Sequence, residues 1–169
     1  MRSSREAPVA DRARCLLLRP AFRIVKRRHA KQAFDGEGAR LAGGRWNSPG
    51  QRAVYLSSTL SLAAKETFVH LADDVAGLDY VYFEVEIPAG LPIARLGVKP
   101  KGWRNEPPIG ASMRVGDRWL KAGASALLEV PSAIIPTETN LILNPIHPDV
   151  NKLRIAAARA FRFDPRMWK

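Results

Sequence analysis

The chain has 169 residues and a net charge of +11, with 46% apolar and 25% charged residues, which is an ordinary composition for a globular protein. This length allows one domain with a sizeable core and is too short for two. No apolar run approaches the roughly 18 residues that a membrane helix needs. The scattered basic residues lack the zinc-ligand sets and aromatic–basic strands of nucleic-acid-binding modules. The composition therefore argues against a membrane protein and against direct sequence-specific binding of nucleic acid.

The N-terminal residues differ in character from the rest of the chain. Residues 1–20 show no hydrophobic periodicity, and we expect an N-terminal extension there, followed by one domain over residues 21–169. Their apolar stretch is too short and too charged for a signal peptide. Cys15 is the only cysteine, so no internal disulfide can form, and a cytoplasmic location is expected.

The first half of the domain predicts two strands and one helix. Ala21–Val25 is a predicted strand in which Arg23 points to the face opposite Phe22 and Ile24. The turn-rich residues 34–44 predict a surface loop, and Ala53–Ser57 predict a second strand. A helix is expected from about Thr59, with Ser58 or Thr59 as its N-cap. Its buried stripe comprises Leu60, Ala63, Ala64, Phe68 and Leu71.

The second half adds several strands and one short helix. Residues 80–87 alternate between apolar and other side chains and predict a half-buried strand. Residues 97–111 are rich in glycine and proline and predict a long loop, and residues 112–123 predict a short helix weakened by Gly116. Two or three short strands are expected within residues 125–145 and another within 154–164. Because helices do not alternate regularly with strands, we predict a single α+β domain with a mixed, largely antiparallel sheet.

One span combines residue types that suit a nucleotide. Arg45 follows two glycines, and the arginine fork binds phosphate oxygens through two hydrogen bonds. Tyr55 points away from Val54 and Leu56 in its strand and offers a flat face for stacking. Glu66 lies beside the apolar stripe of the helix, where an unpaired carboxylate is uncommon. Taken singly, each of these residues is more often structural or solvated.

Two longer runs carry a family resemblance. The run "FDGEGARLAGGRWNSPGQRAVYLSSTLSLAAKETFVHL" and the later run "VPSAIIPTETNLILNPIHPD" resemble the opening and closing signatures of the RES domain. The resemblance extends from about Phe22 to Phe163 and departs from the family's usual pattern at Ala42 and Thr139. It implies a fold similar to that of ADP-ribosyltransferases, and a toxin of the RES–Xre type of toxin–antitoxin system that acts on NAD.

The resemblance also implies a set of site residues. Glu66, Ser132 and Arg45 are expected to be catalytic. Glu66 would offset the positive charge that develops at the anomeric carbon when nicotinamide leaves. NAD, the substrate, would be bound by Arg23, Arg45 and Tyr55. Beside these family positions, we also expect Trp46 and Asn47, which follow Arg45, at the NAD-binding pocket. No metal is expected, since His29 and His70 have no companions at metal-ligand spacing. His147 lies between the prolines Pro145 and Pro148 and is expected to be a turn residue.

The expected function is therefore a bacterial toxin that cleaves the nicotinamide–ribose bond of NAD and is silenced by an Xre-type helix-turn-helix antitoxin. Two alternatives stay open. The chain could transfer ADP-ribose to a macromolecule, or it could be a non-catalytic module that binds a nucleotide or a partner. The motif does not encode whether the acceptor is water, phosphate or a side chain.

Overall fold

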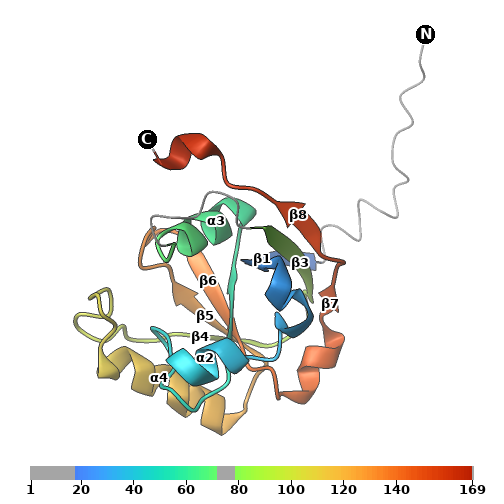
Figure 1. Cartoon of the computed structure of the whole chain (residues 1–169). Coiled ribbons are helices and arrows are strands. Elements are labelled where there is room, and N and C mark those ends of the chain that lie inside the picture. Colours follow the sequence, from blue (N-terminus) through green and yellow to red (C-terminus); the bar gives the residue numbers. More distant parts are fainter. Residues whose placement is uncertain (1–17, 72–78, 169) are drawn as a thin grey trace.

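The computed structural model describes residues 18–71 and 79–168, and the extension expected at residues 1–20 lies almost wholly outside them. In this part of the chain, eight strands form one sheet (Figure 1). The strands are β1 (Leu18–Lys26), β2 (Val54–Ser57), β3 (Tyr80–Pro88), β4 (Ile93–Arg95), β5 (Leu127–Pro131), β6 (Thr139–Leu143), β7 (Arg154–Ile155) and β8 (Arg159–Phe161). The helices are α2 (Glu37–Ala42), α3 (Leu60–Phe68) and α4 (Gly110–Ala122), and the 3-10 turns are η1 (Arg27–Gln32), η2 (Pro148–Lys152) and η3 (Pro165–Trp168). No helix of the described residues is long and apolar enough to cross a bilayer.

The strand order is β4-β5-β6-β2-β1-β3-β7, and β8 also pairs with β3. Only the β4–β5 pair is parallel among the described strands, so the predicted mixed, largely antiparallel sheet is confirmed. The longest strand pairing in the sheet joins β1 with β3 and runs from Leu18↔Pro88 to Lys26↔Tyr80. The predicted alternation in β3 holds, because Val81, Phe83, Val85 and Ile87 are all buried.

Different apolar clusters pack on the two faces of the sheet. One face carries the largest apolar cluster, which includes Val54, Leu56, Val85, Leu141 and Leu143. The other face carries two separate clusters. One lies under α3 and includes Ile24, Ala63 and Tyr80, and the other includes Trp46 and Leu120 beside strands β5 and β6. Figure 1 shows α3 apart from α2 and α4, so the two clusters of this face lie under different helices.

Helix α3 follows its prediction closely. Thr59 is the N-cap, and its Oγ1 accepts a hydrogen bond from Leu62 N at 3.0 Å. Leu60, Ala63, Ala64 and Leu71 pack in one cluster as the periodicity predicts. This helix lies against β1 and β2, and its side chain at position 66 therefore reaches the central strands.

Three predicted segments differ from the structure. Residues 34–44 contain the short helix α2 and are not only a loop; Asp35 Oδ1 accepts a hydrogen bond from Glu37 N at 2.8 Å and so supports its first turn. Strand β4 lies just before the predicted long loop. Residues 154–164 form two short strands, both paired with β3, in place of one.

Gly116 lowers the helix propensity of α4, but the absence of a side chain at this position is needed for packing. It is buried in α4, and a Cβ placed on it would lie 1.6 Å from the carbonyl oxygen of Trp46. The helix backbone therefore packs directly on the backbone of the segment that carries Arg45 and Trp46. Asp117 adds a second tie, since its carboxylate accepts hydrogen bonds from Ser48 N at 2.9 Å and Ser48 Oγ at 2.6 Å.

We predict that Gly116→Ala lowers the free energy of unfolding by about 1–3 kcal/mol or more, because the clash is with backbone that cannot move aside. The control is Gly38→Ala in α2, where an added Cβ has nothing within 4 Å. That change should be neutral or stabilise by up to about 1 kcal/mol. Urea unfolding of both variants tests this, and equal stability of the two would refute the packing argument.

Candidate active site

The centre of the candidate site is the carboxylate of Glu66, held by side chains from two other segments. Its Oε1 accepts hydrogen bonds from Ser132 Oγ at 2.7 Å and from Asn140 Nδ2 at 2.6 Å. Glu66 lies on α3, Ser132 follows β5 and Asn140 lies in β6. Its Oε2 accepts no hydrogen bond from the described residues. The helix, loop and strand thus fix one oxygen and leave the other available to a ligand.

Ser132 can donate only toward Glu66. Its side chain is fully buried, and its Oγ accepts hydrogen bonds from Ile134 N at 3.1 Å and Ile135 N at 3.0 Å. Because both backbone groups are donors, the hydroxyl proton is directed at the carboxylate. The structure therefore brings together the glutamate and the serine that the sequence nominates.

Asn140 and Ser57 extend this arrangement, and sequence reasoning missed both. Asn140 Oδ1 accepts a hydrogen bond from Ser57 Oγ at 2.8 Å, and the two residues are direct partners in the β2–β6 register. Ser57 lies two positions after Tyr55, and Asn140 lies two positions before Ile142, so both side chains are on the sheet face that carries Tyr55 and Ile142. That spacing was the available signal, but it becomes meaningful only once the strand order is known.

Arg23 lies where β1 and β2 separate. The two strands pair only at Phe22↔Ser57, and beyond this point Arg23 Nη1 donates to the carbonyl oxygen of Tyr55 at 2.9 Å. The side chain thus takes the place of a backbone donor. Burial lowers the pKa of Arg23 to about 10, with a small opposing effect from Asp35, so the guanidinium is charged at neutral pH. Its Nε is shielded from solvent and has no hydrogen-bond partner.

Tyr55 is fixed at its hydroxyl. The hydroxyl donates to Asn47 Oδ1 at 2.7 Å and accepts from Trp46 N at 3.1 Å, and burial raises the pKa of this phenol. Gly44 makes room for it, since a Cβ there would lie 2.6 Å from the phenolic oxygen. The absence of a side chain at Gly44 therefore lets the Tyr55 ring approach the backbone of this loop.

Trp46 and Asn47, which the sequence places at the ligand, lie beneath the surface. Their exposed fractions are 2% and 0%. Asn47 Nδ2 donates to the carbonyl oxygens of Ala39 at 2.9 Å and Gln51 at 3.1 Å, and Trp46 stacks on Trp103 with ring centroids 6.0 Å apart. In this structure both residues hold Tyr55 and the surrounding loop, and neither presents an open face to solvent.

Arg45 connects two loops. Its Nη1 donates to the carbonyl oxygens of Trp103 at 2.8 Å and Asn105 at 2.7 Å, and its Nη2 forms an ion pair with Glu106 at 3.0 Å. The Arg45 side chain is 17% exposed, whereas that of Glu106 is 71% exposed. No hydrogen bond or ion pair joins Arg45 to Glu66 in the described chain, so the structure does not bring these two predicted residues into contact.

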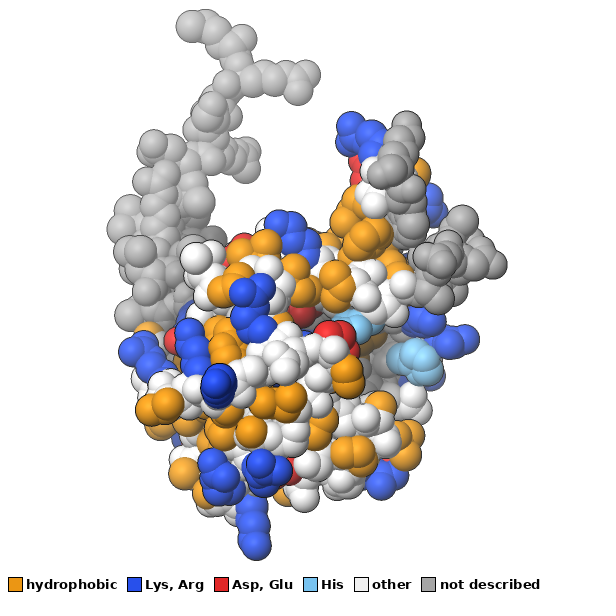
Figure 2. Space-filling model, turned by 90° about the vertical axis from the view of Figure 1, so that its left-hand side faces the viewer, with side chains coloured by type: hydrophobic (Ala, Val, Ile, Leu, Met, Phe, Trp, Pro, Cys, Tyr) orange, Lys and Arg blue, Asp and Glu red, His pale blue; other side chains and the backbone are white. Residues whose placement is uncertain are grey.

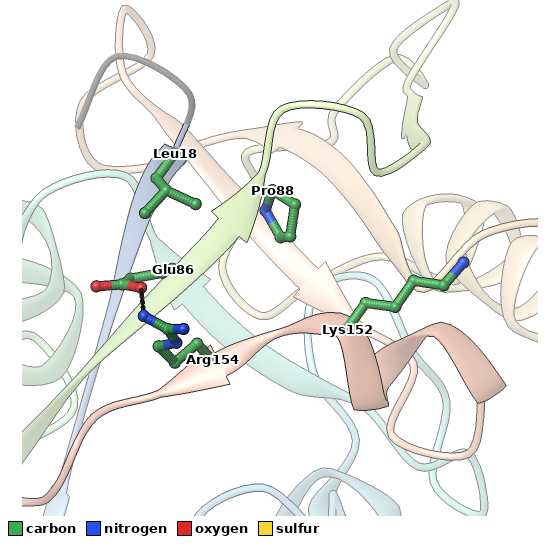
Figure 3. Close-up of a pocket in the computed structure, with 5 residues that line it drawn as sticks. All are labelled: Leu18, Glu86, Pro88, Lys152 and Arg154. Atoms are coloured by element: carbon green, nitrogen blue, oxygen red, sulfur yellow. Dashed lines mark hydrogen bonds and ion pairs between the residues drawn. The ribbon is translucent and has the colours of Figure 1, made fainter. Parts of the chain in front are cut away.

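Other candidate positions serve the fold. His147 caps η2, because its Nδ1 accepts from Asp149 N at 3.1 Å while its Nε2 lies 3.1 Å from the carbonyl oxygen of Gly123, as expected of a turn residue. Residues 18–71 and 79–168 contain no group of three potential metal ligands. A pocket of about 120 Å³ lies at the β3–β7 edge (Figure 3), lined by Leu18, Glu86, Pro88, Lys152 and Arg154. It contains none of the predicted site residues.

Comparisons with known proteins identify the family of this chain. The sequence model of the RES domain matches residues 20–164. The chain is 38% identical to "Toxin Res" of Yersinia enterocolitica, over 86% of this chain and 97% of that protein. It is 40% identical to "Prs ADP-ribosylating toxin" of a Sphingobium species, over 86% of this chain and 94% of that protein.

A solved structure has the same fold. A chain of the crystal structure of the M. tuberculosis MbcT–MbcA toxin–antitoxin complex superposes with a TM-score of 0.68 and 17% sequence identity, covering 89% of this chain and 87% of that chain. At this identity the likeness concerns the fold alone. With the family match across most of its length, two close relatives and this fold, the chain belongs to the RES domain family.

Proposed function

We propose that this chain is the toxin of a bacterial type II toxin–antitoxin pair and that it binds NAD and cleaves its nicotinamide–ribose bond. Membership of the RES family and the names of its relatives, "Toxin Res" and "Prs ADP-ribosylating toxin", support the toxin role. The observation that carries the chemistry is the Glu66 carboxylate, with one oxygen held by Ser132 and Asn140 and the other without a partner among the described residues.

A single oriented carboxylate suits this reaction. The bond between the anomeric carbon and the pyridinium nitrogen breaks with its electron pair going to nicotinamide, which leaves as a neutral molecule. No general acid is needed, unlike in ordinary glycoside hydrolysis. Glu66 offsets the positive charge that develops on the ribose, and a water then adds to the anomeric carbon and loses a proton. Ser132 keeps the carboxylate oriented during this step.

Two arginines and one tyrosine suit the remainder of NAD. In the proposal Arg23 and Arg45 bind the phosphates, since both are cationic and arginine binds phosphate oxygens well. Tyr55 stacks on nicotinamide with its ring. Trp46 and Asn47 contribute indirectly to NAD binding, because their hydrogen bonds hold the Tyr55 hydroxyl in place. Because NAD is the substrate, the proposed place of action is the cytoplasm.

The experiment that tests the proposal is release of nicotinamide from NAD. The wild-type chain should release it, and Glu66→Gln should reduce the rate by on the order of a hundredfold or more, because the change removes charge stabilisation of the transition state. The control is Glu84→Gln, which alters a surface carboxylate of β3 paired with Arg159 and should leave the rate unchanged. A Glu66→Gln variant with a normal rate would exclude Glu66 from this role.

One relative favours a second candidate function. The name "Prs ADP-ribosylating toxin", borne by a protein 40% identical to this chain, supports transfer of ADP-ribose to a macromolecule. With NAD labelled in its adenosine part, this reaction leaves label on the macromolecule, whereas hydrolysis leaves it on small molecules. A non-catalytic binding module would do neither and would bind NAD unchanged.

The proposed binding roles give a separate prediction. Arg45→Lys should weaken NAD binding although the charge is kept, because lysine lacks the planar fork that binds oxygens in pairs. Tyr55→Leu should weaken it by removing the stacking face. Arg52→Lys is the matched control, since Arg52 also pairs with a carboxylate, that of Glu37, at 2.8 Å. Calorimetry with NAD measures all three, and unchanged affinity in Arg45→Lys would remove Arg45 from the phosphate site.

The proposed partner is an Xre-type helix-turn-helix antitoxin. The net charge of +11 suits an acidic partner segment, and Figure 2 shows Lys and Arg side chains spread over the viewed face with fewer acidic ones. We predict that the antitoxin abolishes nicotinamide release at equimolar ratio and supplies the DNA contacts. The chain alone should bind DNA weakly and lose it steeply with salt. Uninhibited release in the complex, or tight sequence-specific DNA binding by this chain alone, would contradict the prediction.

A further inference from the structure

We infer that Asn140, held in turn by Ser57, is a positioning residue for the Glu66 carboxylate. The inference rests on the proposed function, because it assigns Asn140 a part in the same reaction. Neither residue belongs to the set that the family resemblance nominates. The observation that carries it is the continuous chain of hydrogen bonds from Ser57 through Asn140 to Glu66, with distances of 2.8 and 2.6 Å.

The donor and acceptor roles in this series of hydrogen bonds follow from the carboxylate of Glu66 at its end. A carboxylate can only accept hydrogen bonds, so the Asn140 amide must turn its Nδ2 toward Glu66. Its Oδ1 then faces Ser57, and the Ser57 hydroxyl must donate to it. Ser57 is 5% exposed, so water cannot easily replace it. The amide is thereby fixed in one of its two orientations, and it is the orientation that supports a negative charge at position 66.

The hydrogen bond from Ser132 alone does not fix the orientation of the Glu66 carboxylate, and the hydrogen bond from Asn140 completes it. A carboxylate held by one hydrogen bond can rotate about its terminal bond, since that torsion is broad in glutamate. Ser132 holds Oε1 from a loop and Asn140 holds the same oxygen from a strand paired on both sides, with β5 and β2. Two donors from independent elements fix the plane of the carboxylate and so the direction of Oε2. Misplacement of a reacting group by about 1 Å can cost up to about a hundredfold in rate.

The test compares two substitutions of unlike size and charge. Asn140→Ala removes the donor and leaves a small gap, whereas Asn140→Asp keeps the shape and places a second carboxylate beside Oε1. We expect kcat for nicotinamide release to fall between about tenfold and a hundredfold in Asn140→Ala with KM for NAD nearly unchanged. It should fall further in Asn140→Asp. Thr139→Ala is the matched control; Thr139 is the preceding residue of β6, and its Oγ1 lies 3.5 Å from Arg19 Nη2.

A role in packing alone predicts the reverse order, because the isosteric aspartate would then be the milder change. Asn140→Asp with activity equal to or above that of Asn140→Ala at neutral pH therefore overturns the inference. A rise in KM with unchanged kcat in Asn140→Ala also overturns it, since that result would mean contact with bound NAD. Normal activity in both variants does so as well.

A measurement without turnover separates this inference from the proposed function. In the double variant Glu66→Gln, Asn140→Asp the two like charges are no longer side by side, and the amide at position 66 can donate through its nitrogen to the carboxylate at position 140 while its oxygen accepts from Ser132. Its unfolding midpoint should exceed that of Asn140→Asp alone, while nicotinamide release stays absent because the carboxylate is on the wrong element. A double variant no more stable than Asn140→Asp overturns the inference. A wild-type chain that releases no nicotinamide, together with a stabilised double variant, refutes the proposed function and leaves the contact established.

Discussion

The incomplete pairing of strand β2 is the constraint on which the candidate site depends. β2 pairs along its whole length with β6 but meets β1 at one position only, Phe22↔Ser57. Beyond that position the carbonyl oxygen of Tyr55 has lost a backbone donor, and the guanidinium of Arg23 provides one. The separation of the strands thus places a cation between them, at the carbonyl oxygen of Tyr55. A fully paired β2 would leave no place for it.

The polar side chains around this point are ordered within the protein itself. Asn47, Ser57 and Ser132 are all at most 5% exposed, and burial of such groups without partners would be costly. Each has partners, and the hydrogen bonds of Ser57 and Ser132 lead to Glu66, directly or through Asn140. The carboxylate therefore has its orientation before any ligand binds. Preorganisation of this kind is the condition under which a charge stabilises a transition state most strongly.

The secondary-structure elements could be predicted from the sequence more completely than the side-chain contacts of the site. Period-2 alternation identified β3 and helical spacing identified α3, because both elements bury one face against a core. The helix α2 was missed, since its glycines and charges obscure its short turn. Ser57 and Asn140 gave no local signal, because a single polar residue in an apolar strand becomes informative only when its neighbour across the sheet is known. The family resemblance predicted Glu66 and Ser132, which are in contact. Trp46 and Asn47 were expected at the ligand because they follow Arg45, and no sequence pattern could reveal that both are buried.

The hydrogen bonds of Glu66 have a consequence for the order in which the chain acquires its site during synthesis. The partners of Glu66 lie 66 and 74 residues further along the sequence, and Ser57 meets a partner 83 residues away. Contacts of such long range form late and slowly, because the intervening chain must first be closed into a loop. At roughly 5–20 residues per second, a ribosome that has finished α3 needs several more seconds to reach β6. Throughout that interval the nascent chain carries the glutamate without the strand that orients it, so the hydrogen bonds of Glu66 cannot be complete until β6 has been made.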